Sequence, residues 1–254
     1  MRVGDGKTSQ IVLVDVISGQ LSYTRVVAKL YDPLYHDHSS DDVDPFLFVD
    51  VEYARESAAY RYLHGQKEKC IPDYYGSYSM EISHPGQQFR TVRLILLEYV
   101  DGSPMTTLRA DVSRGFRKAV IKQIVNVESQ FYKNNLRHGD IHPRNIIIQG
   151  INSDLSKSCI KFIDFGHAAV GQSPDPRDDN LERMFLPGIY IGPLLRWFKT
   201  HGRVPVCRFG QWIDWDWNKW LLETYQSDIE NITPEMKHNW LPPSVSHQFL
   251  LEMN

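Results

Sequence analysis

Residues 137–145 read Arg-His-Gly-Asp-Ile-His-Pro-Arg-Asn, and three isoleucines follow them directly. A second apolar segment, Lys-Phe-Ile, leads into the tripeptide Asp-Phe-Gly at residues 164–166. Short strands formed by the two apolar runs would place Asp140, Asn145 and Asp164 around one point of a buried β-hairpin. Hard oxygen ligands that converge in this way suit Mg²⁺ together with a phosphate. The sequence therefore predicts a magnesium-phosphate site at these side chains.

Both segments also have simpler interpretations. An Asp-Phe-Gly tripeptide occurs by chance in loops, and His138, Asp140 and His142 could form a metal site of two imidazoles and a carboxylate. Such a metal site would leave Asn145 and the strand before Asp164 without a role. The interpretation therefore depends on whether the upstream chain supplies the other parts of a phosphate site in order.

The two segments match the kinase catalytic loop H-x-D-x-x-x-x-N and the kinase Asp-Phe-Gly motif, so the chain resembles the protein-kinase-like superfamily. The His-Gly-Asp triplet and the histidine at position 142, in place of the usual lysine, resemble the small-molecule branch of that superfamily. This branch includes the aminoglycoside and choline phosphotransferases and related fungal kinase-like proteins. The resemblance implies ATP and Mg²⁺ as cofactors.

The resemblance also implies a role for each polar residue of the two motifs. Asp140 would accept the proton of the substrate hydroxyl, while Asn145 and Asp164 would hold Mg²⁺ against the phosphates. His142 would donate a hydrogen bond beside the transferred phosphate, although structural packing explains it as well. The expected catalytic residues are thus Asp140, His142 and Asn145, and the expected metal ligands are Asn145 and Asp164.

The N-terminal segment contains a glycine-rich turn before an expected strand at residues 12–14. Gly4 and Gly6 would let backbone N–H groups approach phosphates closely, and Ser9 stands where the kinase loop G-x-G-x-x-G-x-V has its third glycine. A plain turn is the alternative. The similarity of Gly-Lys-Thr to a Walker P-loop is rejected, because that motif needs a glycine where Met1 stands.

Lys29 is the charged exception in the segment 23–30, whose apolar residues on both faces indicate a strand that is buried on both sides. A lysine in such a strand either extends to the edge of the sheet or meets an anion. The strand pattern alone leaves both possibilities open.

A helix is expected to begin at Pro45, with Asp44 as its cap, and to end near Gly65. Its inward stripe follows steps of three and four residues: Phe46, Val49, Tyr53, Glu56, Tyr60 and Leu63. Glu56 would be the only carboxylate on the buried side, while Glu52 is expected to face solvent.

Glu56 needs a cationic partner, because an unpaired buried carboxylate is strongly destabilising. Lys29, the odd charge of the neighbouring strand, is the natural partner. The pair matches the strand lysine and helix glutamate of kinases, in which the lysine contacts the α- and β-phosphates of the nucleotide. Lys29 and Glu56 are therefore expected at the cofactor site.

Two further strands are expected at residues 74–82 and 91–100. The second ends near Glu98 and Val100, which resemble the kinase hinge, where backbone groups pair with the adenine edge; a simple strand end is the alternative. A helix is then expected at residues 113–135 and would carry the catalytic loop. Its apolar positions repeat at helical spacing: Phe116, Val120, Ile124, Val127 and Phe131.

The chain after the Asp-Phe-Gly motif departs from protein kinases. It contains no Ala-Pro-Glu motif, and residues 173–179 form a short polar loop in place of a long peptide-binding segment. Gly139 replaces the arginine that usually receives an activation-loop phosphate, so control by such phosphorylation is not expected. Trp217, Trp220 and Leu221 would share a helix face that is either core or an aromatic wall for the acceptor.

Composition limits the partners of the chain. Its 254 residues fit one kinase-like domain, and a net charge of −3 gives no general attraction to nucleic acid or to an anionic membrane. Cys70, Cys159 and Cys207 are far apart and in no metal-ligand spacing, which favours a reducing compartment. No secretory leader and no membrane span are expected, so the expected location is the cytoplasm.

The expected fold is α+β and bilobal, a single protein-kinase-like domain. A small antiparallel β-sheet N-lobe with one helix would span about residues 1–99, and a mainly helical C-lobe about residues 100–254. The expected function is ATP- and Mg²⁺-dependent transfer of a phosphoryl group to a hydroxyl of a small molecule, because the peptide-docking segment is missing. An atypical protein serine/threonine kinase and a non-catalytic nucleotide-binding pseudokinase are the alternatives. The sequence specifies neither the acceptor nor the oligomeric state.

Overall fold

The structure is a computed structural model, and it describes residues 9–22, 24–35, 44–65, 69–83, 89–108, 112–150, 159–171, 191–198 and 206–236. The chain divides into two compact units. The first unit comprises Met1–Gly102 with Lys161–Val170, and the second comprises Ser103–Ile160 with Gly171–Asn254. The segment that contains the Asp-Phe-Gly motif therefore belongs to the same unit as the N-terminal sheet.

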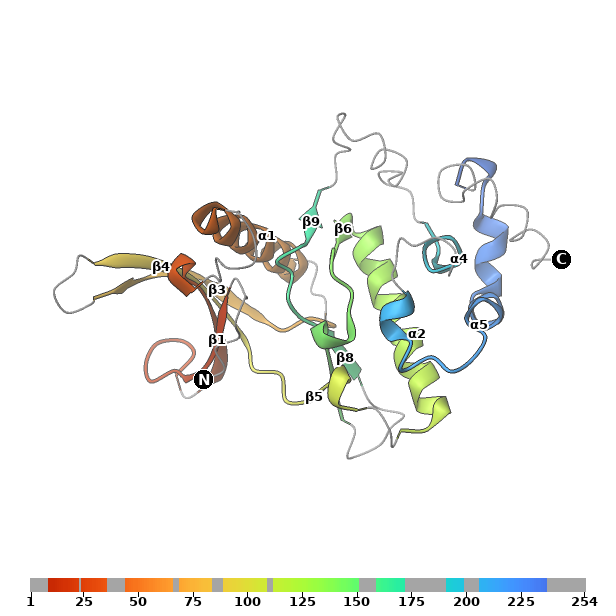
Figure 1. Cartoon of the computed structure of the whole chain (residues 1–254), viewed down its shortest axis with the longest axis horizontal. Coiled ribbons are helices and arrows are strands. Elements are labelled where there is room, and N and C mark those ends of the chain that lie inside the picture. The colour runs from red at the N-terminus through yellow and green to blue at the C-terminus, as the bar shows by residue number, and fades with distance from the viewer. Residues whose placement is uncertain are drawn as a thin grey trace. The chain divides into compact units, whose positions relative to one another are not determined.

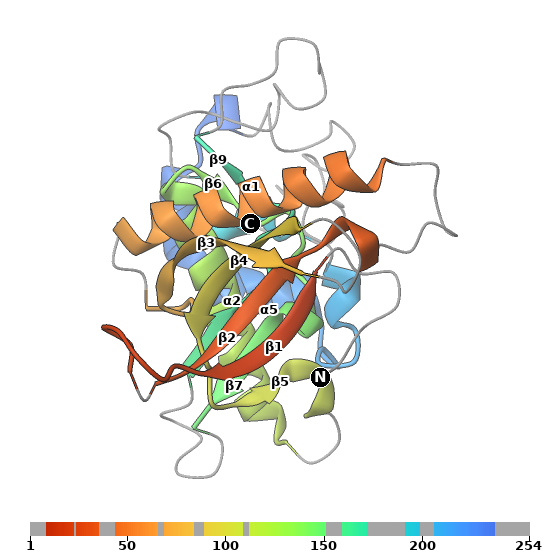
Figure 2. The same cartoon turned by 90° about the vertical axis from the view of Figure 1, so that its left-hand side faces the viewer.

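The first unit contains a four-stranded antiparallel sheet (Figure 1), and its strand order β1-β2-β4-β3 can be followed in Figure 2. Its strands are β1 (Gln10–Asp15), β2 (Arg25–Tyr31), β3 (Tyr74–Ile82) and β4 (Arg90–Glu98). The predicted strands are confirmed, although β2 begins two residues later than expected and β4 ends two residues earlier. β2 and β4 are the central strands, so β2 is paired on both sides, and in this register Lys29 lies between Ile11 of β1 and Ile95 of β4.

Helix α1 (Pro45–Gly65) packs beside this sheet, as Figure 2 shows. The predicted bounds are confirmed, and so is the cap, because the Asp44 Oδ1 atom accepts a hydrogen bond of 2.9 Å from the backbone N–H of Phe46. The short 3₁₀ helix η1 (Pro33–Tyr35) precedes α1, and strand β9 (Ala169–Val170) completes the regular elements of the described part of this unit.

Two details of the predicted α1 stripe are wrong. The Glu52 side chain is buried, with 8% of the residue exposed, whereas Phe46 is 60% exposed. Successive residues turn by about 100° around a helix, so Glu52 lies about 40° from Glu56 and Phe46 lies about 80° from it. Glu52 therefore shares the buried face, and Phe46 falls at the margin of the stripe.

The second unit is built around helix α2 (Arg114–Lys133), which confirms the helix predicted at residues 113–135 but ends two residues earlier, and Ser113 is its cap residue. All five apolar positions that define the predicted stripe of this helix are buried. The shorter helices are α4 (Pro193–Arg196) and α5 (Trp217–Thr224), with 3₁₀ helices η2 (Met105–Thr107), η3 (Pro143–Asn145), η6 (Val206–Phe209) and η7 (Gln226–Asn231).

Strand β7 (Ile146–Gln149) lies between β5 (Ser103–Pro104) and β8 (Cys159–Phe162), and β6 (Leu136–Arg137) precedes the catalytic loop. Strand β8 begins in the second unit and ends in the first. Strands β7 and β8 confirm the strands predicted at the two apolar runs, after Asn145 and before Asp164.

Aromatic side chains form much of the core of the second unit. Trp197, Trp212, Trp217 and Trp220 are buried, and the ring centroids of Trp217 and Trp220 lie 5.0 Å apart. The core interpretation of Trp217, Trp220 and Leu221 is therefore confirmed rather than that of an aromatic wall.

Several predicted features lie outside the described residues: Gly4 and Gly6 of the glycine-rich turn and the polar loop 173–179. Within the described part of the chain, no helix combines the length and the apolar character that crossing a membrane requires.

Candidate active site

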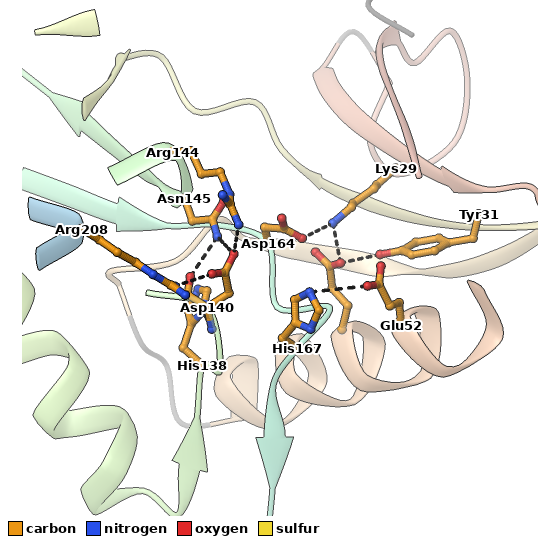
Figure 3. Close-up of polar contacts among 11 residues, drawn as sticks. Lys29, Tyr31, Glu52, His138, Asp140, Arg144, Asn145, Asp164, His167 and Arg208 are labelled. Atoms are coloured by element: carbon orange, nitrogen blue, oxygen red, sulfur yellow. Dashed lines mark hydrogen bonds and ion pairs between the residues drawn. The ribbon is translucent and has the colours of Figure 1, made fainter. Parts of the chain in front are cut away.

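Lys29 connects three elements of the first unit. Its Nζ atom lies 2.6 Å from Oε2 of Glu56 on α1 and 2.6 Å from Oδ1 of Asp164, which follows β8 (Figure 3). The hydroxyl of Tyr31 also donates to the Glu56 Oε2 atom, at 2.5 Å. Lys29 and Tyr31 are two residues apart on β2 and therefore point to the same face of the sheet. The predicted pairing of Lys29 with Glu56 is confirmed, and extension of Lys29 to the sheet edge is excluded.

The charges of this cluster are strongly coupled. Burial by itself lowers the pKa of Lys29, but the charges of Glu56 and Asp164 outweigh it and leave the pKa above its ordinary value. Burial raises the pKa of Glu56, and the contacts with Lys29 and Tyr31 offset only part of that effect. One cation thus serves two carboxylates, and the Glu56 Oε1 atom is buried without a hydrogen-bond partner among the described residues. The cluster carries a surplus of negative charge.

The Asp-Phe-Gly segment is held against α1 by its aromatic residue. Phe165 is fully buried, and its ring lies edge-on to Tyr60 of α1, with 5.1 Å between the ring centroids. Asp164 adopts a positive φ of 67°, in the left-handed region that few non-glycine residues adopt and that aspartate tolerates better than most. Its side chain is 43% exposed. The packing of Phe165 therefore fixes a turn that presents the Asp164 carboxylate to solvent on one side and to Lys29 on the other.

Sequence reasoning missed Glu52 as a member of this cluster. Its Oε1 atom lies 3.6 Å from Nε2 of His167, and its Oε2 atom is close to Gly166, at 3.4 Å from where a Cβ would stand. The spacing of four residues between Glu52 and Glu56 could have indicated that Glu52 is buried, because residues i and i+4 share a helix face.

The catalytic-loop motif of the second unit centres on Asp140, which is 7% exposed. The Asp140 Oδ2 atom accepts hydrogen bonds from Nη2 of Arg144 at 2.6 Å and from Nδ2 of Asn145 at 2.9 Å. Its Oδ1 atom accepts one from Nη1 of Arg208 at 2.7 Å, as Figure 3 shows. The motif thus brings Asp140 and Asn145 together, and two arginines join them.

Local backbone contacts explain why the loop adopts this shape. The His142 Nδ1 atom accepts the N–H of Arg144 at 3.2 Å and so caps η3, and Pro143 occupies the first turn. His138 is buried, and its Nδ1 atom accepts the N–H of Asp140 at 3.3 Å. Gly139 has a φ of 81°, which glycine adopts without strain. His142 therefore has a structural role here, and its predicted contact with a phosphate stays a prediction.

The pKa values of the loop follow from its charges. Burial alone would raise the pKa of Asp140, but the hydrogen bonds and charges of Arg144, Asn145 and Arg208 bring it below its ordinary value. Burial, followed by the charge of Arg144, lowers the pKa of His142. At neutral pH the loop therefore contains an ionised Asp140 and a neutral His142.

Asn145 of the second unit and Asp164 of the first unit carry oxygen atoms of the kind that Mg²⁺ prefers. The Asn145 amide uses its Nδ2 atom to donate to the Asp140 backbone oxygen and to Oδ2, so its amide oxygen is not needed for these two contacts. Asp164 offers a partly exposed carboxylate beside Lys29. The described residues contain no group of three His, Cys, Asp or Glu that could hold a metal, so the alternative site at His138, Asp140 and His142 is not supported. A common Mg²⁺ site at Asn145 and Asp164 stays a prediction.

The predicted hinge residues lie at the end of β4. The Glu98 Oε2 atom accepts hydrogen bonds from Nζ of Lys161 at 2.6 Å and from the N–H of Asp73 at 3.0 Å, and Val100 is buried. Ser9 directly precedes β1. The nucleotide contacts proposed for Ser9, Glu98 and Val100 stay predictions.

Arg144 and Arg208 were not identified from the sequence. Arg144 lies inside the catalytic-loop motif, four residues after Asp140, so its position in the motif could have indicated a contact with Asp140. Arg208 is 68 residues from Asp140 in the chain, and no local pattern marks it.

The α+β fold, the cluster of Lys29, Glu56 and Asp164, and the loop with Asp140 and Asn145 define a kinase-like protein. The family model of the ABC1 atypical kinase-like domain matches residues 13–186. This match covers more than half of the 254 residues, and the chain belongs to that family. The predicted membership in the protein-kinase-like superfamily and the predicted fold class are therefore confirmed, whereas no finding indicates a particular closeness to the aminoglycoside and choline phosphotransferases. No curated protein matches the chain.

Proposed function

We propose that the protein is an ATP- and Mg²⁺-dependent phosphotransferase that acts on a hydroxyl of a small molecule. The observation that carries this proposal is the position of the Lys29 Nζ atom between Glu56 and Asp164, at 2.6 Å from each. A buried ammonium held by two carboxylates of different elements is fixed in direction, and kinases use a lysine in this setting to contact nucleotide phosphates. The family of atypical kinase-like domains supports the same reading.

Each residue would contribute one function. Lys29 would bind the α- and β-phosphates, and Glu56 with Tyr31 would hold its side chain in place. Asn145 and Asp164 would hold Mg²⁺, which neutralises charge on the transferred phosphoryl group. Asp140 would orient the acceptor hydroxyl and take its proton. With a lowered pKa Asp140 is a weak base, which suits a loose transition state in which positioning dominates.

A nucleotide-binding pseudokinase is the second candidate, and two contacts favour it. The Asp164 Oδ1 atom, which a metal would use, pairs with Lys29, and both carboxylate oxygens of Asp140 pair with arginines. In an active enzyme these contacts must loosen when the nucleotide and the acceptor bind. The two candidates therefore differ in whether bound nucleotide is turned over.

The test compares the wild type with Asp140→Asn, which retains the size of the side chain and loses its basicity. Nucleotide affinity should survive, while phosphoryl transfer and slow ATP hydrolysis should fall by roughly 10²- to 10⁴-fold, the usual contribution of a positioned general base. The measurements are turnover of labelled ATP and nucleotide affinity by calorimetry. A metabolite extract incubated with labelled ATP and analysed by mass spectrometry would identify the acceptor. A wild type that turns over no ATP with Mg²⁺ or Mn²⁺, with or without a broad acceptor panel, would replace the phosphotransferase by the pseudokinase.

A further inference from the structure

The surroundings of Asp140 contain more positive than negative charge. Arg144 and Arg208 each form an ion pair with its carboxylate, at 2.6 Å and 2.7 Å. Among the described residues neither arginine pairs with a second carboxylate. The neighbouring His142 carries no negative charge and cannot compensate the excess. Two guanidinium groups therefore share one carboxylate, and the second unit has a net positive charge at this point.

The two carboxylate oxygens of Asp140 are not equally occupied. Each oxygen of a carboxylate can accept about two hydrogen bonds. The Oδ2 atom accepts two, from Arg144 and Asn145, whereas the Oδ1 atom accepts one, from Arg208, among the described residues. A hydroxyl that donates to Asp140 therefore finds its place at Oδ1, beside the guanidinium group of Arg208.

Both arginines can bind a further anion. A guanidinium group has five N–H donors in a planar fork that matches phosphate and carboxylate groups. Among the described residues the hydrogen bonds of the two side chains use only Nη2 of Arg144 and Nη1 of Arg208, and the latter atom also lies 3.4 Å from the backbone oxygen of Ile141. The side chains are 59% and 39% exposed, so an incoming ligand can reach them.

We propose that Arg208, together with Arg144, binds an anionic group, either phosphate or carboxylate, on the acceptor whose hydroxyl Asp140 orients. This inference rests on the proposed function and names its substrate class: a small hydroxylated molecule that already carries a negative charge. Arg208 lies beyond the residues 13–186 that match the family model, so the contact does not follow from family membership. An anion at this place would balance the second guanidinium group and free Oδ1 for the hydroxyl.

The nucleotide is the competing source of the anion. In the proposed function its phosphates are already matched by Lys29 and Mg²⁺, whereas Arg208 shares the Asp140 oxygen that the acceptor would use. Binding of the acceptor is therefore the reading that the geometry favours, and the experiment separates the two.

The experiment uses matched probes and matched variants of the full chain. The probes are glycerol 3-phosphate and glycerate against neutral glycerol, each titrated by calorimetry with a non-hydrolysable ATP analogue and Mg²⁺ present. The variants are Arg208→Gln, Arg208→Lys and Arg114→Gln. Arg114 is an exposed arginine of the same unit that pairs with Asp214, so its substitution controls for the loss of a surface charge.

The wild type should bind at least one anionic probe more tightly than glycerol. Arg208→Gln should weaken that binding by roughly 10- to 100-fold, the usual effect of losing a hydrogen bond to a charged group. Arg208→Lys should retain part of it, and Arg114→Gln should retain all of it. The affinity for the ATP analogue should not change in Arg208→Gln.

Two outcomes would overturn the inference: anionic probes that bind no better than glycerol, or an Arg208→Gln variant that loses affinity for the ATP analogue instead of the probe. Failure of the proposed function gives a different result. A wild type that turns over no ATP but binds an anionic probe through Arg208 would end the phosphotransferase proposal and leave the anion site intact.

Discussion

Lys29 and Glu56 carry buried charges of opposite sign, and each charge is stabilised by the other. The Lys29 side chain is 9% exposed and that of Glu56 is 1% exposed, so neither charge is compensated by water. Breaking a fully buried pair leaves one uncompensated charge, which is more costly than the net contribution of the intact pair. Tyr31 and Asp164 moderate this cost, because each remains as a partner for one member.

We expect Lys29→Met and Glu56→Gln each to lower the free energy of unfolding by up to about 3–5 kcal/mol, the cost of a fully uncompensated buried charge. The double variant should lose less than the sum, because it leaves no isolated charge from the pair. Urea unfolding of the two single variants and the double variant gives the coupling energy.

Arg25→Met is the matched control for this cycle. Arg25 lies on the same strand as Lys29 and forms an exposed ion pair with Asp15 of β1. Its substitution should lower the free energy of unfolding much less than Lys29→Met does. Strict additivity of the Lys29 and Glu56 variants would show that the two charges act independently.

Asp140 should titrate below its ordinary pKa of 3.8, because Arg144, Asn145 and Arg208 favour its ionised form more than burial disfavours it. A carboxyl whose pKa is lowered by folding stabilises the folded state at all pH values above 3.8, and this contribution is lost as the pH falls through the lower folded value. Carboxyl NMR titration, assigned with Asp140→Asn, should show a higher pKa in Arg144→Gln than in the wild type. An unchanged pKa would mean that Arg144 does not act on Asp140 in solution.

At the scale of single elements, the two long helices differ in the side chains that they position. Helix α1 places Glu56 against Lys29 and Glu52 against the Asp-Phe-Gly segment from one face, whereas α2 contributes a buried apolar stripe and leads into the catalytic loop. Both helices begin with a side-chain cap, from Asp44 and from Ser113. The caps fix where each helix starts, and with it the face that each residue occupies.

Ser113→Ala should lower the free energy of unfolding by about 0.5–2 kcal/mol, because the Ser113 Oγ atom accepts the N–H of Phe116 at 3.2 Å and that N–H would lose its partner. Thermal or urea unfolding measures the loss. Ser227→Ala, at an exposed position of η7 in the same unit, should have no comparable effect. Equal losses in both variants would argue against the cap as the cause.

At the scale of the whole molecule, the predicted cofactor ligands come from both units. Lys29, Glu56 and Asp164 belong to the first unit, and Asp140 and Asn145 belong to the second. The Asp-Phe-Gly segment joins the first unit although it follows the catalytic loop in the chain. The two predicted Mg²⁺ ligands, Asn145 and Asp164, thus belong to different units.

We expect ATP to bind weakly without Mg²⁺ and more tightly with it, because Asp164 adds negative charge that the triphosphate alone would meet unfavourably. Calorimetric titrations with and without Mg²⁺ measure the difference. Asp164→Asn and Asn145→Ala should each reduce the gain from Mg²⁺. Equal affinity of the wild type in both conditions would exclude the metal assignment.

Local sequence patterns determined a large part of this protein. The apolar runs and helical stripes predicted the strands and helices, because burial repeats with the period of each element. The Lys29–Glu56 pair could be predicted as well, because two isolated buried charges of opposite sign in adjacent elements must compensate each other.

Only the tertiary structure decided which distant residues complete these clusters. Asp164 is 135 residues from Lys29 and Arg208 is 68 residues from Asp140, and no periodicity relates positions so far apart. The burial of Glu52 was decided in the same way, since α1 meets the Asp-Phe-Gly segment on the face that Glu52 shares with Glu56. The sequence therefore determined the elements and one ion pair, whereas folding determined the charge balance around Lys29 and Asp140, because that balance depends on contacts through space.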